Sequence, residues 1–275
     1  MNENSISRPS KEQLMELAQK LRMQRFTRLY LKAMEEEDFI KEDELTKLYI
    51  ILKQVSGELD VVRYNRNVRK SGIPSSLLLL NEKPIAAQKN NISLKNLQFI
   101  EENVLCGRCR PVLISGPAGS GKTSLGAEIM NRLLHQQLKC RVFDYTRMMQ
   151  ELNSYFNNSL EYDGKLNALS SLNMLMLDDC FMAKCFEYEG NVLRDLLNIC
   201  AERRCCIMLA SQLPVEKWYE HFPDPYTADS IADRLNAGPI KILLTCESLR
   251  KEKGVIFGGK IAQLATTTAE VSNER

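Results

Sequence analysis

The spacing of hydrophobic residues divides the chain into two unlike parts. Through residues 11–34 and again through 45–62, apolar residues recur every three or four positions, which is the period of an amphipathic helix. After residue 93 the apolar residues instead form short runs that are separated by helix-like segments. The runs are VLIS at 112–115, CRVF at 140–143, MLML at 174–177, CIMLA at 206–210 and IKILL at 240–244. Strands that alternate with helices form parallel sheets covered on both faces, so we expect an α/β fold with a five-stranded parallel sheet.

Local signals indicate where the front helices begin and end. Ser10 followed by Gln13 matches a capping box, which predicts a helix start near residue 11. Gly57 is a candidate break within the second helical stretch, and SGIP at 71–74 is expected to end it, because proline cannot continue a helix. The predicted organisation is a helical domain at 1–74, a connector at 75–92, an α/β domain at 93–260 and a flexible tail at 261–275.

Composition narrows the class of protein. Of the 275 residues, 44% are hydrophobic and 26% charged, as in an ordinary globular protein. No apolar run approaches the roughly 18 residues of a membrane span, and the N-terminus lacks the apolar core of a secretory signal. The nine cysteines fit reduced, buried thiols better than a disulfide framework. We therefore expect a cytoplasmic protein without a membrane partner.

The sequence GPAGSGKTSL at 116–125 matches the phosphate-binding pattern GxxxxGK[ST]. It follows a predicted strand and opens a predicted helix, which is the setting that this pattern requires. Lys122 is expected to reach the β- and γ-phosphates of ATP, and the Thr123 hydroxyl to ligate Mg²⁺. A glycine-rich turn without a ligand is the weaker alternative. The expected nucleotide-binding residues are Gly116, Pro117, Ala118, Gly119, Ser120, Gly121, Lys122, Thr123 and Ser124.

Polar residues also follow the next two central strands. Asp178 is expected to hold Mg²⁺, and Asp179 to orient or activate the water that attacks the nucleotide. A buried strand with an acidic end is the weaker alternative beside a phosphate-binding loop. Ser211 and Gln212 leave the following strand at the same sheet edge, where open parallel sheets bind ligands. These two either contact the γ-phosphate and the water or cap the next turn, and the residues alone favour neither.

Basic residues gather at the end of the helical front part. Arg63, Arg66 and Lys70 share one helical face, Arg69 lies beside them, and residues 61–72 contain no acid. Such a stripe can neutralise DNA phosphates with little sequence preference. A solvated helix end explains it equally well, because cations near a helix C-terminus are favoured by the dipole. Three arginines of the first helical stretch are candidates to extend the patch: Arg22, Arg25 and Arg28.

Taken together, these residues resemble the AAA+ ATPases of the IstB/DnaC-like group, which contains helper ATPases of bacterial insertion sequences and replicative helicase loaders. SQLPVEKWYEHFPDPYTADSIADRL at 211–235 is similar to the IstB stretch in which Ser-Asn-Leu-Pro and Trp precede Phe-x-Asp-Pro and Asp-Arg-Leu. CESLR at 246–250 resembles the group's Glu-Ser-x-Arg ending, and RYNRNVRKSGIP at 63–74 resembles the helix end before its ATPase domain. The likeness extends over residues 12–252 and is most specific at 211–235.

The resemblance implies a role for each matching residue. Gly116 to Thr123 correspond to Walker A, Asp178 and Asp179 to Walker B, Gln212 to sensor 1, and Arg234 to an arginine finger that reaches a neighbouring subunit. For Arg234, an ion pair with Asp233 or another acid is the weaker alternative.

The chain departs from the group's pattern at two of these positions. Where the group usually has Glu, this chain has the shorter Asp179, and Gln212 replaces the usual Asn. A displacement of about 1 Å in a catalytic group can lower the rate ~10²-fold. We therefore expect the two departures to affect the rate of ATP hydrolysis and to leave ATP binding intact. Since 31 residues follow Leu244, we expect no C-terminal lid domain, as in the IstB type.

The function implied by the resemblance is an ATP-dependent helper of transposition. It would assemble on double-stranded DNA as a homo-oligomer, with ATP and Mg²⁺ at subunit interfaces, and assist a transposase. The resemblance also favours DNA binding over a solvated helix end as the interpretation of the basic stripe. The alternatives are a replicative helicase loader whose front helices grip a helicase, a nucleotide-binding assembly protein with little turnover, and a small-molecule kinase, against which the 211–235 block argues.

Overall fold

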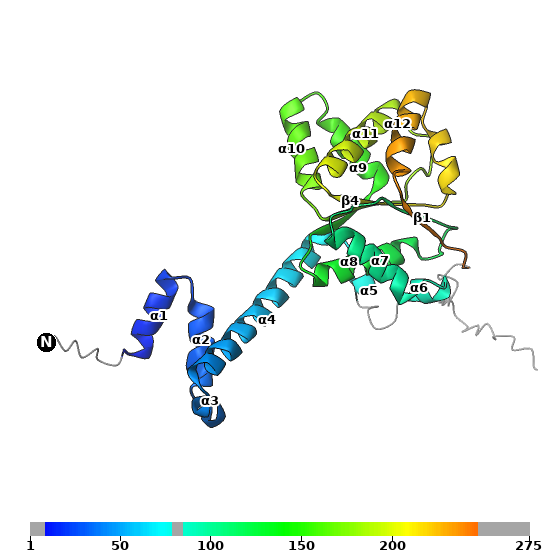
Figure 1. Cartoon of the computed structure of the whole chain (residues 1–275). Helices are drawn as coiled ribbons and strands as arrows, with labels where there is room; N and C mark the ends of the chain where they lie inside the picture. The colour runs from blue at the N-terminus through cyan, green and yellow to red at the C-terminus, as the bar shows by residue number, and fades with distance from the viewer. Residues whose placement is uncertain (1–8, 79–84, 247–275) are drawn as a thin grey trace, which may run out of the picture.

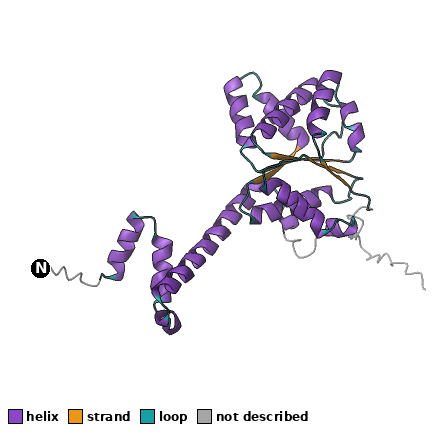
Figure 2. Ribbon diagram, in the orientation of Figure 1, coloured by secondary structure: helices purple, strands orange, loops and turns teal. Residues whose placement is uncertain are grey.

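The computed structural model describes residues 9–78 and 85–246, and its centre is a five-stranded, wholly parallel sheet (Figure 2). The strand order is β2-β3-β4-β1-β5. The strands are β1 (Val112–Ser115), β2 (Cys140–Asp144), β3 (Met174–Asp178), β4 (Cys206–Ser211) and β5 (Ile240–Leu243). The prediction of five parallel strands from the apolar runs is therefore confirmed. Since the strands are parallel, their carboxyl ends all lie at one edge of the sheet.

Helices cover both faces of this sheet (Figure 1). One layer contains α9 (Tyr145–Ser154), α10 (Ser159–Ser170), α11 (Glu187–Glu202) and α12 (Pro225–Leu235), with the 3₁₀ turns Val215–Lys217 and Tyr219–His221. The other contains α5 (Ser75–Leu78), α6 (Ile85–Lys89), α7 (Leu94–Leu105) and α8 (Lys122–His135). Side chains of β1 alternate between them: Leu113 packs into the first layer, and Val112 and Ile114 into the second. Burial on both faces explains why the central strands β1, β3 and β4 have continuous apolar sequences.

The helical front part consists of α1 (Lys11–Lys20), α2 (Gln24–Ala33), α3 (Glu37–Lys41) and the long α4 (Glu44–Ser71). Ser10 and Gln13 form the predicted capping box of α1. The apolar pattern at 11–34 is broken by a turn between α1 and α2, where Arg22 has a φ of 58°. By contrast, α4 continues through Gly57, because a single glycine costs a helix only about 1 kcal/mol. The expected break at Gly57 is thus wrong, whereas the helix end at 71–74 is confirmed by Gly72 at the C-cap.

The helix α4 connects the front helices to the α/β domain (Figure 1). Near its C-terminus, the Tyr64 hydroxyl donates a hydrogen bond to Asn131 Oδ1 at 2.8 Å, and the Tyr64 ring stacks on His135 with centroids 4.2 Å apart. Gly72 then approaches β2 so closely that a Cβ there would lie 2.8 Å from the carbonyl oxygen of Val142. These contacts fix where α4 leaves the domain.

The residues predicted as a connector, 75–92, contain the short helices α5 and α6, both of which pack against α8. The predicted tail at 261–275 and the end of the CESLR motif lie outside the described residues. No helix in the described ranges has the length and apolar character that a membrane span requires.

Candidate nucleotide-binding site

The loop between β1 and α8 has a backbone that only glycine adopts readily. Gly119 and Gly121 have φ angles of 79° and 97°, in the left-handed region. Gly116 touches the chain that follows β5, because a Cβ on it would lie 2.6 Å from the Leu244 carbonyl oxygen. Since α8 begins at Lys122, the unpaired N–H groups and the positive dipole end of the helix lie at this loop. The loop therefore has the features of a phosphate cradle.

Three side chains complete this cradle. Lys122 is 6% exposed, and its Nζ donates to the carbonyl oxygens of Gly116 and Pro117, both at 2.9 Å. The Thr123 hydroxyl donates to the Asp178 carboxylate at 2.6 Å. An ammonium group suits phosphate oxygens, and a hydroxyl beside a carboxylate offers the hard oxygen ligands that Mg²⁺ prefers. The residues present thus fit a nucleotide together with Mg²⁺.

The carboxyl group of Asp178 lies at the end of β3. Burial raises its pKa above the usual value, the hydrogen bond from Thr123 opposes that rise, and the neighbouring Asp179 adds to it. A cation beside Asp178 would favour the ionised form. The exposed Asp179 follows with a left-handed φ of 52°, and its N–H donates to Asp178 Oδ1 at 3.0 Å. The two carboxylates are thus differently placed: one is tied to the cradle, and the other is open to solvent.

The two polar residues at the end of β4 differ in their contacts. Ser211 is fully buried, its hydroxyl donates to the Cys180 carbonyl oxygen at 2.7 Å, and it accepts the Leu213 N–H at 3.2 Å. For Ser211, the capping alternative is therefore correct. Gln212 is half-buried at the edge where the phosphate loop and Asp178 lie, since β4 pairs with both β1 and β3. Gln212 follows the strand that separates these two parts of the site.

Arg234 lies in the last turn of α12, away from the phosphate loop. Its guanidinium donates to the Asn198 side chain and to the carbonyl and hydroxyl oxygens of Ser230, both at 2.7 Å. These partners are neutral, and no ion pair with Asp233 occurs within the part of the chain described. Because α12 ends just before β5 begins, Arg234 lies near the amino edge of the sheet, whereas Lys122 lies at the carboxyl edge. The structure does not bring the two together within one chain.

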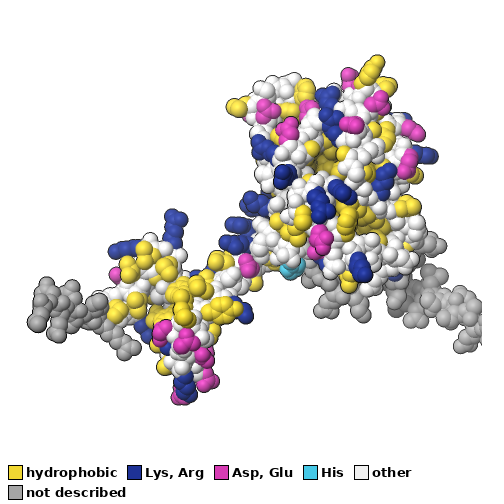
Figure 3. All heavy atoms as spheres, in the orientation of Figure 1, with side chains coloured by type: hydrophobic (Ala, Val, Ile, Leu, Met, Phe, Trp, Pro, Cys, Tyr) yellow, Lys and Arg dark blue, Asp and Glu magenta, His cyan; other side chains and the backbone are white. Residues whose placement is uncertain are grey.

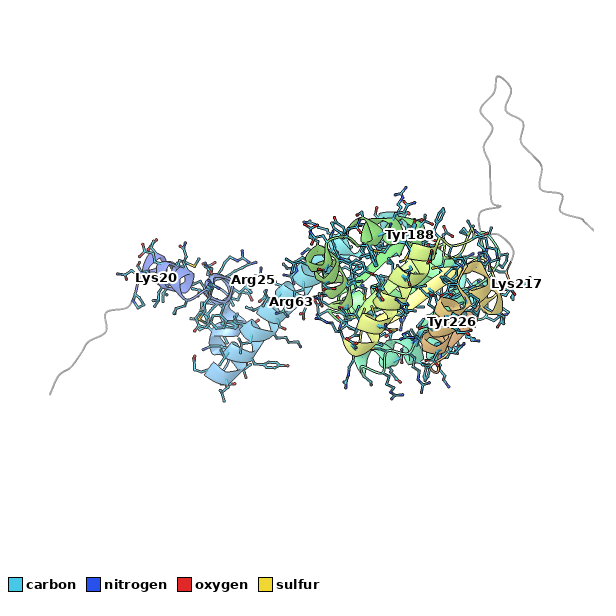
Figure 4. The ribbon with its side chains drawn as sticks, turned by 90° about the horizontal axis from the view of Figure 1, so that it is seen from above. Lys20, Arg25, Arg63, Tyr188, Lys217 and Tyr226 are labelled. Atoms are coloured by element: carbon cyan, nitrogen blue, oxygen red, sulfur yellow. The ribbon has the colours of Figure 1, made fainter. Side chains whose placement is uncertain are left out.

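The basic stripe lies on the C-terminal part of α4. Figure 4 shows Arg63 on this helix, between the front helices and the α/β domain. All four residues predicted for DNA binding are exposed: Arg63, Arg66, Arg69 and Lys70. Of these, Arg63 also pairs with Asp60 at 3.7 Å. The α4 face that bears Tyr64 is instead docked on the domain, through its hydrogen bond to Asn131. Of the candidates to extend the stripe, Arg25 and Arg28 both form ion pairs with Glu58 at 3.4 Å. The Glu58 carboxylate partly neutralises them, which weakens their attraction for an anionic partner such as DNA.

Sequence reasoning missed Asn90, whose amide connects three segments at the phosphate loop. Its Nδ2 donates to the carbonyl oxygens of Ala86 at 2.8 Å and of Ser120 at 3.2 Å. Its Oδ1 accepts the N–H groups of Thr245 at 2.9 Å and Cys246 at 3.0 Å. In the sequence, Asn90 occurs in a polar KNN run that indicates only a turn, and the partners are up to 156 residues away.

The sheet order, the glycine-rich loop after β1 and the acidic pair after β3 together define a P-loop ATP-binding protein of the AAA+ type. The model of the family described as "IstB-like ATP binding protein" matches residues 80–255. The chain belongs to this family.

Several known proteins are similar to the chain. One is an insertion sequence ATP-binding protein of Sinorhizobium fredii, 28% identical over 57% of this chain and 53% of its own length. An ATP-binding protein in an insertion sequence of Mycobacterium tuberculosis is 27% identical over 52% of this chain and 56% of its own length. The chain thus spans about half the length of these relatives.

Among solved structures, the crystal structure of DnaI has a TM-score of 0.47 at 21% identity, covering 54% of this chain and 82% of its own. The crystal structure of the DnaC helicase loader has a TM-score of 0.46 at 12% identity, covering 58% of this chain and 90% of its own.

Proposed function

We propose that this protein hydrolyses ATP and uses the cycle to assist transposition on double-stranded DNA. The observation that carries the ATPase part is the 2.6 Å hydrogen bond between Thr123 and Asp178 beside the glycine cradle. It joins the residue after the P-loop lysine to the end of β3, as a site for a magnesium nucleotide requires.

In this proposal the protein binds ATP through residues 116–124. Their backbone N–H groups surround the phosphates, and Lys122 exchanges its two loop carbonyl partners for β- and γ-phosphate oxygens. Thr123 and Asp178 would hold Mg²⁺, which when bound neutralises charge on the phosphate oxygens. Asp179 accepts a proton from the water that attacks the γ-phosphorus, and Gln212 orients that water. The bond from the γ-phosphorus to the bridging oxygen breaks, which releases ADP and inorganic phosphate.

Arg234 acts in this proposal on the ATP of a neighbouring subunit. Support comes from its position near the sheet edge opposite Lys122 and from its neutral hydrogen-bond partners, since no acidic side chain in the described ranges pairs with the guanidinium. A trans arginine finger requires a homo-oligomer, and its charge stabilises the transition state of phosphoryl transfer.

A mixing experiment tests the trans role. Lys122→Ala removes the phosphate contact and Arg234→Ala the finger, so each variant alone should lose hydrolysis. In a mixture, some interfaces combine an intact Lys122 from one subunit with an intact Arg234 from the other, and activity should partly return. A mixture as inactive as its parts would show that Arg234 does not act in trans.

The proposed partners are double-stranded DNA and a transposase. The relatives are named as insertion sequence ATP-binding proteins, and the exposed stripe of Arg63, Arg66, Arg69 and Lys70 suits DNA phosphates. The test is steady-state ATP hydrolysis without DNA, with duplex DNA and with single-stranded DNA, using Lys122→Ala as the blank. We expect stimulation by duplex DNA that Arg66→Glu/Lys70→Glu abolishes while basal hydrolysis remains. Stimulation by single strands alone would contradict the transposition role.

A further inference from the structure

The helix α4 carries a regular apolar stripe that is largely exposed in the described structure, although one member, Val55, is half-buried against the small core around Ile51. Its positions alternate between steps of three and four residues, as in a heptad repeat: Leu45, Leu48, Leu52, Val55, Leu59 and Val62. This is the spacing of the a and d positions of a coiled coil, in which one helix packs along another. With a rise of about 1.5 Å per residue, the stripe is about 26 Å long.

Five of these six side chains are exposed. Leu45 is 78% exposed, Leu52 51%, and Val62 52%. The neighbouring face of α4 packs against α2, through Ile51 in a small core and through Glu58 in its ion pairs with two α2 arginines. Hydrophobic side chains accordingly cover much of the visible surface of the front helices (Figure 3). Contiguous exposed apolar surface of this kind marks an interaction site.

Charge at the two ends of the stripe indicates which helix fits it. The segment before the stripe, 35–44, is strongly acidic: Glu35, Glu36, Glu37, Asp38, Glu42, Asp43 and Glu44, with Lys41 as its one basic residue. The residues after it include Arg63, Arg66, Arg69 and Lys70 without an acid. A second α4 in antiparallel orientation would bring the basic end of each copy to the acidic segment of the other. A parallel pair would instead place like charges together, which is unfavourable.

We propose that α4 pairs in antiparallel orientation with α4 of a second copy of this chain. Leu45 of one copy then faces Val62 of the other, and Leu48 faces Leu59. This contact is separate from the ATP site and does not depend on the proposed ATPase function. It also offers the basic stripe an anionic neighbour other than DNA, so DNA and the acidic segment of the second copy compete for Arg63, Arg66 and Lys70.

The first test measures the mass of the nucleotide-free, full-length protein by light scattering. We expect twice the 31.5 kDa of one chain for the unaltered protein and for Lys122→Ala, which concerns only the ATP site. Leu48→Glu/Leu52→Glu is expected to reduce the mass to that of one chain. The control is Leu160→Glu, since Leu160 is an 83% exposed leucine on α10 and its variant should keep the doubled mass. A monomeric unaltered protein, or a dimer that survives the double substitution, would overturn the proposal.

The second test measures orientation by disulfide formation under mild oxidation. Leu45→Cys and Val62→Cys are prepared separately and then mixed, and the linked peptides are identified by mass spectrometry. Antiparallel pairing predicts a 45–62 link between chains in the mixture, because disulfides form only between Cα atoms about 4.4–6.8 Å apart. Links of 45 to 45 or 62 to 62 in the separate variants would indicate a parallel pair and overturn the orientation. The unaltered protein serves as the control for its nine native cysteines.

Discussion

Replacing Gly116 with alanine tests whether the phosphate loop owes its shape to close packing against the chain after β5. A Cβ at this position would lie 2.6 Å from the Leu244 carbonyl oxygen and 2.9 Å from the Leu244 Cβ. Ordinary contacts begin at 3.4 Å, so the loop would have to move by about 0.8 Å. Overpacking of this kind costs about 1–3 kcal/mol, and each 1.4 kcal/mol corresponds to a tenfold change in an equilibrium constant. We therefore expect ATP to bind Gly116→Ala roughly 5–150-fold more weakly.

The assay is a titration with a fluorescent ATP analogue in the presence of Mg²⁺, with thermal unfolding measured in parallel. Gly164→Ala is the matched control, because nothing lies within 4 Å of a Cβ built at Gly164 in α10. That variant should bind the analogue normally and gain up to about 1 kcal/mol of stability from its higher helix propensity. If Gly116→Ala binds as tightly as Gly164→Ala, the packing of the loop does not govern ATP binding.

Further predictions concern pH, the hydrophobic core and Mg²⁺. Burial raises the pKa of the Glu128 carboxyl group from 4.5 to about 7, and the charge of Arg132 opposes this rise. Between these two pH values the folded protein holds a proton that the unfolded chain has lost. The free energy of unfolding therefore falls as the pH rises from 4.5 through 7. Glu128→Gln should be more stable than the unaltered protein at pH 8 by about 1 kcal/mol after solvent screening, with no gain at pH 4.5, as measured by urea unfolding. Trp218 is fully buried, and its indole N–H donates to the Leu213 carbonyl oxygen at 2.9 Å. Trp218→Leu should therefore lower the free energy of unfolding by about 3 kcal/mol, as measured by circular dichroism. Asp178→Asn should keep its melting temperature without ligand but lose most of the shift that MgATP produces, whereas an unchanged shift would exclude Asp178 as a magnesium ligand.

The strands and the phosphate loop could be predicted because their signals are local. Each strand is signalled by a short run rich in apolar residues, which is buried on both faces in the central strands β1, β3 and β4, and the loop glycines recur at fixed spacing before Lys122. The helix boundaries were less predictable, since Arg22 turns the chain where the apolar pattern continues and Gly57 does not break α4. Long-range contacts left no signal in the sequence. The role of Asn90 is an example, because its hydrogen bonds join segments that only the fold brings together.

The central claim is that the loop at 116–124 binds ATP, and calorimetric titration of MgATP into the full-length protein tests it most directly. Lys122→Ala removes the ammonium group from the cradle. Lys139→Ala is the matched control, because Lys139 is exposed and precedes β2 at the other edge of the sheet. We predict saturable binding to the unaltered protein and to Lys139→Ala, and at least tenfold weaker binding to Lys122→Ala. Equal binding to all three proteins would contradict the claim.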